Sequence, residues 1–236
     1  MKYRAYIFLC LLISLSTLLL ARGLSHADLS SAVWNRREES PTVIVIDPGH
    51  GGEDGGACTA AGLCESQLNL EISLRVRDLL SFLGARTKMI RDRDISVSTE
   101  GNSIAARKIS DIHNRVRITE ETPNALLLSI HQNHFSQAKY RGAQVFYGKA
   151  EGSEPWAERL QEGLRTQVDP NNRRQCKLAK DIYLMEHVSC PAVLVECGFL
   201  SNFEEARQLQ ESSYQKKLAA VIACCTLSYT EEKNEI

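Results

Sequence analysis

The chain has 236 residues, with 28 basic and 29 acidic side chains and a formal net charge of -1. This balance argues against a nucleic acid as the partner, because nucleic-acid-binding domains carry a clear excess of basic side chains. The length suits one sizeable hydrophobic core with an appendage and does not require a second domain.

The N-terminal segment 1–27 has the layout of a secretory signal. Lys2 and Arg4 precede an uncharged apolar run that extends to Ala21, and the small residues that end at Ala27 suit cleavage. The same run is just long enough to serve as an uncleaved membrane anchor instead, so both alternatives stay open. Either one predicts an exported protein whose contact with the membrane is confined to this segment.

The rest of the chain reads as a linker, one domain and a short tail. Residues 28–41 are polar, lack periodicity and end in a proline, which is typical of a linker. Over residues 42–230, short apolar runs alternate with segments of helical periodicity, and residues 231–236 form a polar tail. This alternation predicts an α/β fold: a single domain with a mostly parallel, twisted sheet of about six strands and helices on both faces.

A long amphipathic helix is expected to begin near Glu65 and to end at Gly84, which is typical of a C-cap. Its predicted apolar face consists of four residues at helical spacings, Leu68, Ile72, Leu79 and Leu83. Later in the chain, residues 181–185 (DIYLM) form only a short apolar run, and His187 is expected in a loop between strands.

The cysteine pattern does not indicate a structural zinc site, because the eight cysteines include no CxxC pair. Cys58 and Cys64 are the two that lie close enough together in a loop to form a disulfide, but the sequence leaves the disulfide state of the cysteines open. The others are expected mainly as small buried apolar residues.

The segment 43–56, VIVIDPGHGGEDGG, runs from an apolar strand into a glycine-rich loop, and such loops often bind phosphate. Neither phosphate-binding motif fits. A dinucleotide motif needs glycine at the position of Asp54, and a P-loop needs lysine and a hydroxyl residue where Ala57 and Cys58 stand. Glu53 and Asp54 would also repel a phosphate, so the loop is interpreted as presenting His50.

A metal site is predicted from four residues of the right types at strand ends or a helix start. In an open parallel sheet, ligands bind at the carboxyl ends of the strands. That edge should carry four side chains, His50, Glu65, His131 and Glu196. Two imidazoles and one carboxylate form a common catalytic zinc set, and a further carboxylate can accept a proton from water.

Each of the four also has an ordinary interpretation. His50 could be a turn residue, Glu65 an acid favoured in the first turn of a helix, and His131 a hydrogen-bonded core histidine. Glu196 argues against coincidence, because a charged residue rarely ends a strand as apolar as AVLVE without a partner.

The remaining candidates are weaker. His134 is expected at the rim, and His113 on a solvated helix face with Lys108, Arg115 and Arg117. Cys197 should face away from Glu196 into the packing layer, which disfavours a thiol enzyme. HExxH and GxSxG are absent, which excludes two other hydrolase motifs.

The four motifs VIVIDPGHGGEDGG, ESQLNL, LLLSIHQNHF and PAVLVECGFLSN, in this order, resemble the zinc-dependent N-acetylmuramoyl-L-alanine amidases of the amidase type 3 family. Within that family the resemblance is closest to the germination-specific amidases of spore-forming bacteria. It implies Zn²⁺ held by His50, Glu65 and His131, with Glu196 as the catalytic base. Arg115 and the stretch 91–94 also match positions of the family.

The function that the resemblance implies is hydrolysis of the amide between N-acetylmuramic acid and the L-alanine of peptidoglycan stem peptides, in spore cortex and on the way to muramic lactam. It also implies peptidoglycan as the substrate and an accessory lipoprotein as a possible activator. Two alternatives stay open at this point: a zinc peptidase of stem peptides, and a peptidoglycan-binding protein without catalysis.

Overall fold

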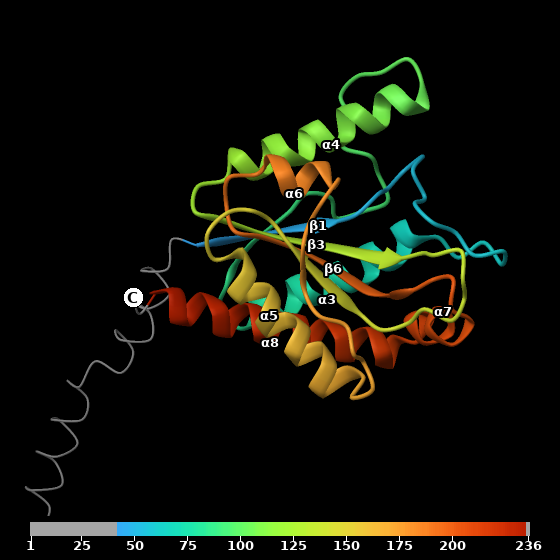
Figure 1. The fold of residues 1–236 in the computed structure, drawn as a ribbon. Helices are drawn as coiled ribbons and strands as arrows, with labels where there is room; N and C mark the ends of the chain where they lie inside the picture. The colour runs from blue at the N-terminus through green and yellow to red at the C-terminus, as the bar shows by residue number, and fades with distance from the viewer. Residues whose placement is uncertain (1–41, 235–236) are drawn as a thin grey trace, which may run out of the picture. The chain divides into compact units, whose positions relative to one another are not determined.

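The computed structural model describes residues 42–234, in which six strands form one sheet in the order β2-β1-β3-β6-β4-β5 (Figure 1). β1, β2, β3 and β6 run parallel to one another, β4 is antiparallel to β6, and β5 is parallel to β4. This confirms the predicted mostly parallel sheet. The strands are β1 (Val43–Pro48), β2 (Arg86–Met89), β3 (Ala125–Asn133), β4 (Gln144–Tyr147), β5 (Lys177–Leu178) and β6 (Ala192–Phe199).

The expected signal or anchor, the linker up to residue 41 and the last two residues of the tail lie outside the described residues. Within residues 42–234, no helix is long and apolar enough to cross a membrane.

Helices cover both faces of the sheet, as predicted (Figure 1). One face packs against α3 (Glu65–Phe82), α5 (Ser153–Gly163) and α8 (Ser212–Asn234), and a π-helical turn (Leu164–Val168) continues α5. The other face packs against α4 (Ile104–Glu120) and the short α6 (Tyr183–His187). Alternate residues of β1 divide between the two cores: Ile44 and Ile46 face α3, and Val45 faces the side of α4.

The buried face of α3 differs from the predicted one. Leu68 and Ile72 are buried as expected, but the next buried apolar residues are Val76 and Leu80, each four positions further on. Leu79 is only partly buried, and Leu83, which follows the last helical residue, is 50% exposed. Gly84 adopts φ +91° and Ala85 donates to the carbonyl of Leu80, which is the expected glycine-terminated helix end.

Three local predictions for the second half need correction. His187 ends helix α6 instead of lying in a loop between strands, because Leu184 and Met185 both turn towards the core within one helical turn. A helix over Phe203–Gln210 (α7) was not predicted. Helix α8 continues to Asn234, so the first residues of the predicted polar tail are exposed helix.

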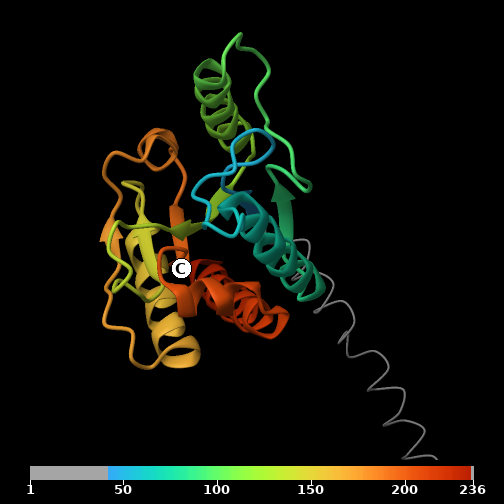
Figure 2. The same cartoon turned by 90° about the vertical axis from the view of Figure 1, so that its right-hand side faces the viewer.

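The carboxyl ends of β1, β3 and β6 meet at one edge of the sheet. From β1 the chain passes through α3 to β2 on one side, and it returns through α4 to β3 on the other, so the direction of winding changes between β1 and β3. Figure 2 shows the loop that follows β1 lying between the start of α3 and α4. Ligands bind at this kind of switch point in open α/β sheets.

Candidate metal centre

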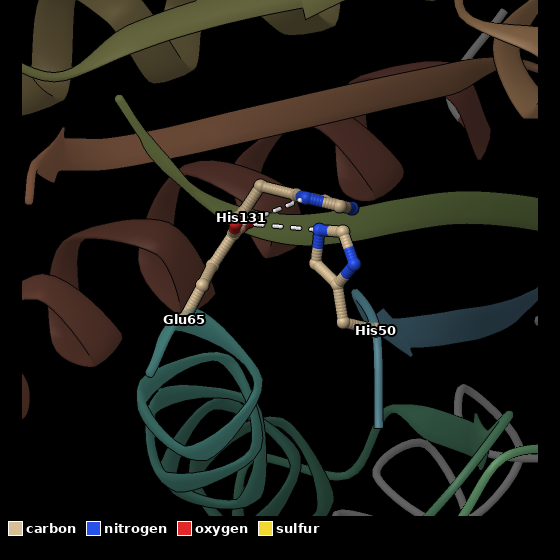
Figure 3. A group of neighbouring side chains, drawn as sticks. All are labelled: His50, Glu65 and His131. Atoms are coloured by element: carbon tan, nitrogen blue, oxygen red, sulfur yellow. Dashed lines mark hydrogen bonds and ion pairs between the residues drawn. The ribbon is translucent and has the colours of Figure 1, made fainter. Parts of the chain in front are cut away.

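Three of the predicted residues converge at this edge (Figure 3). His50 comes from the loop after β1, Glu65 is the first residue of α3, and His131 lies near the end of β3. One ligand atom from each lies within 4.8 Å of the others. Glu65 Oε1 is 2.8 Å from His131 Nδ1, and Glu65 Oε2 is 3.3 Å from His50 Nε2. The sequence prediction that these side chains meet is confirmed.

The Glu65 carboxylate is held in place from several sides. It is 4% exposed, and its oxygens accept hydrogen bonds from the backbone N–H groups of Gln132 and Ala57, each at 3.1 Å. Burial would raise the pKa of Glu65, but the two histidines outweigh it and hold the pKa well below its usual range. A buried carboxylate that stays ionised between two imidazoles suits a divalent cation.

His50 has an unusual backbone and a fixed ring. Its φ of +59° lies in the left-handed region, which is uncommon for a residue other than glycine and is often found at functional sites. Its Nδ1 lies 2.8 Å from Asp54 Oδ2, which leaves Nε2 directed at Glu65. Burial lowers the pKa of His50, but Glu65 and Asp54 outweigh it and raise that pKa to about 9. The site therefore attracts positive charge.

Two glycines clear space for these side chains. A Cβ atom on Gly49 would lie 2.2 Å from the His131 ring, and one on Gly56 would lie 2.7 Å from both Glu65 Oε2 and the His50 ring. No larger residue fits at either position unless a candidate ligand moves. Gly51 and Gly52 serve the loop itself, because their Cβ atoms would meet the backbone around Ile95.

Two arginine side chains hold the loop that carries His50 in place by hydrogen bonds. Arg91 donates to the carbonyls of Pro48, Gly49 and Ser66, and Arg115 donates to those of Pro48 and His50. Arg115 was predicted on a solvated helix face and is instead only 3% exposed in its side chain, paired with the buried Asp47 and with Asp111. Arg115 lies on the buried face of α4 with Ser110 and Thr119.

The Arg115 pair provides a stability prediction. Replacement of Arg115 by methionine leaves the Asp47 carboxylate buried without its partner, so the free energy of unfolding should fall by about 3–5 kcal/mol. Urea denaturation measures the change. Arg117→Met is the control on the same helix, because Arg117 is 54% exposed in its pair with Glu121 and should contribute about 0–1 kcal/mol. Equal effects for the two variants would contradict a special role for the buried pair.

Glu196 lies beside this cluster. It is the register partner of His131 in the parallel pair of β3 and β6, so the two side chains leave the sheet on the same face. Its Oε2 atom is buried and has no hydrogen-bond partner in the described part of the chain. Burial raises the pKa of Glu196 to about 7, with His131 lowering it and Glu65 raising it. Such a carboxyl can exchange a proton near neutral pH.

The weaker candidates stay outside the cluster. Cys197 is fully buried in the core on the side of α3, as predicted, and burial raises its pKa far above the ordinary thiol value. His134 is exposed. His113 is also exposed, with its ring centroid 5.1 Å from that of Tyr183.

A cavity of about 440 Å³ adjoins the cluster, between the glycine loop and α4. His50 and His131 form part of its wall, and Arg107, Lys108 and Ile112 of α4 also line it. Arg107 pairs with Glu53 at 2.5 Å and Lys108 with Asp54 at 2.7 Å. A substrate in this cavity would contact the candidate metal ligands directly.

Sequence reasoning missed the residues that support the ligands. Asp54 was considered only as a residue that repels phosphate, whereas it orients His50. Asn69, one helical turn after Glu65, donates to both the Glu65 carboxylate and the carbonyl of Gly49. Asp47 could have been recognised from the sequence as a candidate site residue, because it follows an apolar strand in the same way as Glu196.

Comparisons with known proteins point in the same direction. Residues 44–225 match the sequence family described as N-acetylmuramoyl-L-alanine amidase. A germination-specific N-acetylmuramoyl-L-alanine amidase of Bacillus subtilis (strain 168) is 40% identical over 198 residues, which cover 83% of this chain and 83% of that protein.

Two solved structures resemble the described fold. The CwlD amidase from Clostridioides difficile, solved in complex with the GerS lipoprotein, has a TM-score of 0.78 at 36% identity, over 81% of this chain and 99% of that one. An N-acetylmuramoyl-L-alanine amidase from Clostridium difficile 630 has a TM-score of 0.72 at 26% identity, over 83% of this chain and 100% of that one. Each of these two matches covers more than four fifths of this chain.

Proposed function

The chain belongs to the N-acetylmuramoyl-L-alanine amidase family, and on this basis we propose that it uses zinc to cleave the amide between the lactyl group of N-acetylmuramic acid and L-alanine. The observation that carries the proposal is the convergence of His50, Glu65 and His131 beside the half-buried Glu196 and a cavity. Two imidazoles and one carboxylate are the donor set of many catalytic zinc sites.

A zinc ion held by these three side chains would supply a water of lowered pKa and polarise the scissile carbonyl. Glu196 would take a proton from water on its carboxylate and then donate it to the leaving amine of L-alanine. Its pKa of about 7 suits both directions of transfer. His50 is oriented by Asp54, and Glu65 by two backbone N–H groups, so the ligands are held before substrate arrives.

The biological setting that we propose is the spore cortex. The germination-specific relative is 40% identical over 83% of both chains, which supports a role in cortex maturation and muramic lactam formation. The CwlD structure contains the GerS lipoprotein, so an accessory lipoprotein is a reasonable activator for this chain as well. We further propose that segment 1–27 directs export of the protein across the membrane. The compartment outside the membrane holds the peptidoglycan, and disulfides persist there.

The function is tested with the purified full chain. Zinc is counted by mass spectrometry, and defined muropeptides are digested and analysed for a stem peptide with a free L-alanine amine. One zinc per chain and this single product are expected. A folded protein without zinc, or cleavage within the stem peptide, would overturn the proposal, and a deletion strain with normal muramic lactam would overturn the cortex role.

The orientation of His50 provides a matched pair of variants. Asp54→Ala removes the hydrogen-bond partner of His50 Nδ1, so zinc affinity should fall by about 10- to 100-fold, which is typical when such a supporting partner is lost. Competition with a chromogenic chelator measures the affinity. Glu53→Ala is the control, because Glu53 pairs with Arg107 and not with His50. Equal zinc affinity in the two variants would contradict this role of Asp54.

A further inference from the structure

A disulfide joins Cys58 to Cys64, the pair whose oxidation state the sequence left open, and it closes a short hairpin directly before Glu65. The two cysteines form an antiparallel bridge, and Leu63 donates its backbone N–H to Thr59 Oγ1 within the turn. Cys58 is exposed and Cys64 is half-buried. Cys64 is also the N-cap residue of α3, so the disulfide is attached to the end of the helix that carries the candidate metal ligand.

The backbone around this disulfide holds Glu65. The N–H of Glu65 donates to the Ala57 carbonyl at 2.8 Å, and the N–H of Ala57 donates to Glu65 Oε2 at 3.1 Å. The N–H of Ser66 donates to the Gly55 carbonyl at 3.0 Å. Residues 55–57 are thus hydrogen-bonded to the first turn of α3, and the Cys58–Cys64 bond links the two segments covalently.

The start of α3 has no side-chain cap among the described residues, although most helix starts gain stability from such a cap. Gly55 also packs against the bond, because a Cβ atom there would lie 3.3 Å and 3.4 Å from the two sulfur atoms. The same short loop leads through Gly56, where a Cβ atom would meet both His50 and Glu65.

We propose that the Cys58–Cys64 disulfide positions Glu65 for metal binding, so that the retention of zinc depends on the redox state of this pair. The inference rests on the proposed zinc role of Glu65. With the bond intact, the loop at residues 55–57 keeps the carboxylate between the two imidazoles. With the bond reduced, the loop is free to separate from the first turn of α3, and the carboxylate loses the fixed geometry that favours metal binding.

The reduction is a balanced two-electron exchange with a dithiol reductant. One thiolate of the reductant attacks Sγ of the exposed Cys58, and Cys64 leaves as a thiolate. The second thiolate of the reductant then attacks the mixed disulfide and releases Cys58. The two cysteines take up two protons and end as thiols, and the reductant ends as a disulfide. Zinc retention would accordingly improve when the chain reaches an oxidising compartment.

Zinc binding to the full chain tests the proposal without any measurement of activity. The dissociation constant and the dissociation rate of zinc are measured by chelator competition for the unaltered protein, for Cys58→Ser/Cys64→Ser, and for protein reduced with dithiothreitol and then freed of it without oxygen. The double variant and the reduced protein should both bind zinc about 10- to 100-fold more weakly. Zinc affinity in the reduced protein should recover on reoxidation, and the double variant should not respond to either treatment.

Two controls separate the disulfide from general loosening. Thr59→Ala removes the hydrogen bond within the same hairpin but keeps the disulfide, and Cys224→Ser removes an exposed thiol from α8. Both should keep the zinc affinity of the unaltered protein.

Zinc affinity within twofold of the unaltered protein, in both the folded double variant and the reduced protein, would overturn the inference and leave the proposed function intact. An equal loss in Thr59→Ala would overturn it too. Absence of zinc binding in the unaltered protein would overturn both. If the double variant does not fold, reduction of the folded unaltered protein decides.

Discussion

Replacement of Glu196 by glutamine should lower kcat by about 100- to 10,000-fold, the range for loss of a general acid–base residue. Glutamine keeps the size of the side chain but has no carboxylate to accept a proton from water. The buried Oε2 atom of Glu196 has no hydrogen-bond partner in the part of the chain that the structure describes, so no other contact should be lost with it. Zinc content and the unfolding transition should therefore stay as in the unaltered protein.

The pH profile separates a proton-transfer role from a structural one. Burial raises the pKa of Glu196 to about 7, and the base form is lost as the pH falls through the pKa, so kcat/KM should decline on the acid side. A bound cation moves this decline to lower pH. The residual kcat/KM of Glu196→Gln should not show this decline at acid pH. The exposed Glu120→Gln is the control, and undiminished activity in Glu196→Gln would contradict the mechanism.

Replacement of Gly49 by alanine should abolish zinc binding and with it the activity. The new Cβ atom would lie 2.2 Å from the His131 ring, so the ring must leave its position. The backbone cannot easily retreat, because the Gly49 N–H donates to Ile130 and its carbonyl accepts from Asn69 and Arg91. Loss of a supporting hydrogen bond typically weakens metal binding by about 10- to 100-fold, and the loss of zinc affinity in Gly49→Ala should be larger. Overpacking should also lower the free energy of unfolding by about 1–3 kcal/mol.

Gly62→Ala is the matched control for Gly49→Ala. Among the described atoms nothing lies within 4 Å of a Cβ at Gly62, although its φ of +84° costs alanine about 1–2 kcal/mol of backbone strain. This variant should lose some stability and keep its zinc. Zinc titration with parallel urea denaturation measures both quantities, and a Gly49→Ala protein with normal zinc affinity would disprove the steric argument.

The chemistry at the edge of the sheet could be predicted because it depends on strand ends. An apolar strand that stops at a charged or imidazole residue identifies its carboxyl end, and parallel strands bring those ends together. His50 and His131 were found in this way, and Glu65 from its place at the start of the following helix. The sheet itself followed from the alternation of apolar runs and helical periodicity.

The supporting residues could not be predicted, because their partners are distant in the sequence. Arg115 contacts Asp47 from 68 positions away, and the α4 pattern alone gave no reason to place an arginine against the sheet. Asp54 becomes an orienting residue only because His50 adopts a left-handed backbone, and this conformation is not visible in residue types. The short helix α6 was missed because five residues carry too little periodicity to identify a helix.

The convergence of ligands from separate elements links metal binding to folding. Glu65 and His131 lie 66 positions apart, so the unfolded chain does not present the donor set as a unit. A ligand that binds only the native state stabilises it by mass action, by about 2.7 kcal/mol when its free concentration is 100 times the dissociation constant. Zinc would thus contribute to the thermal stability of the whole sheet, and a chelator would lower the melting temperature without touching the core.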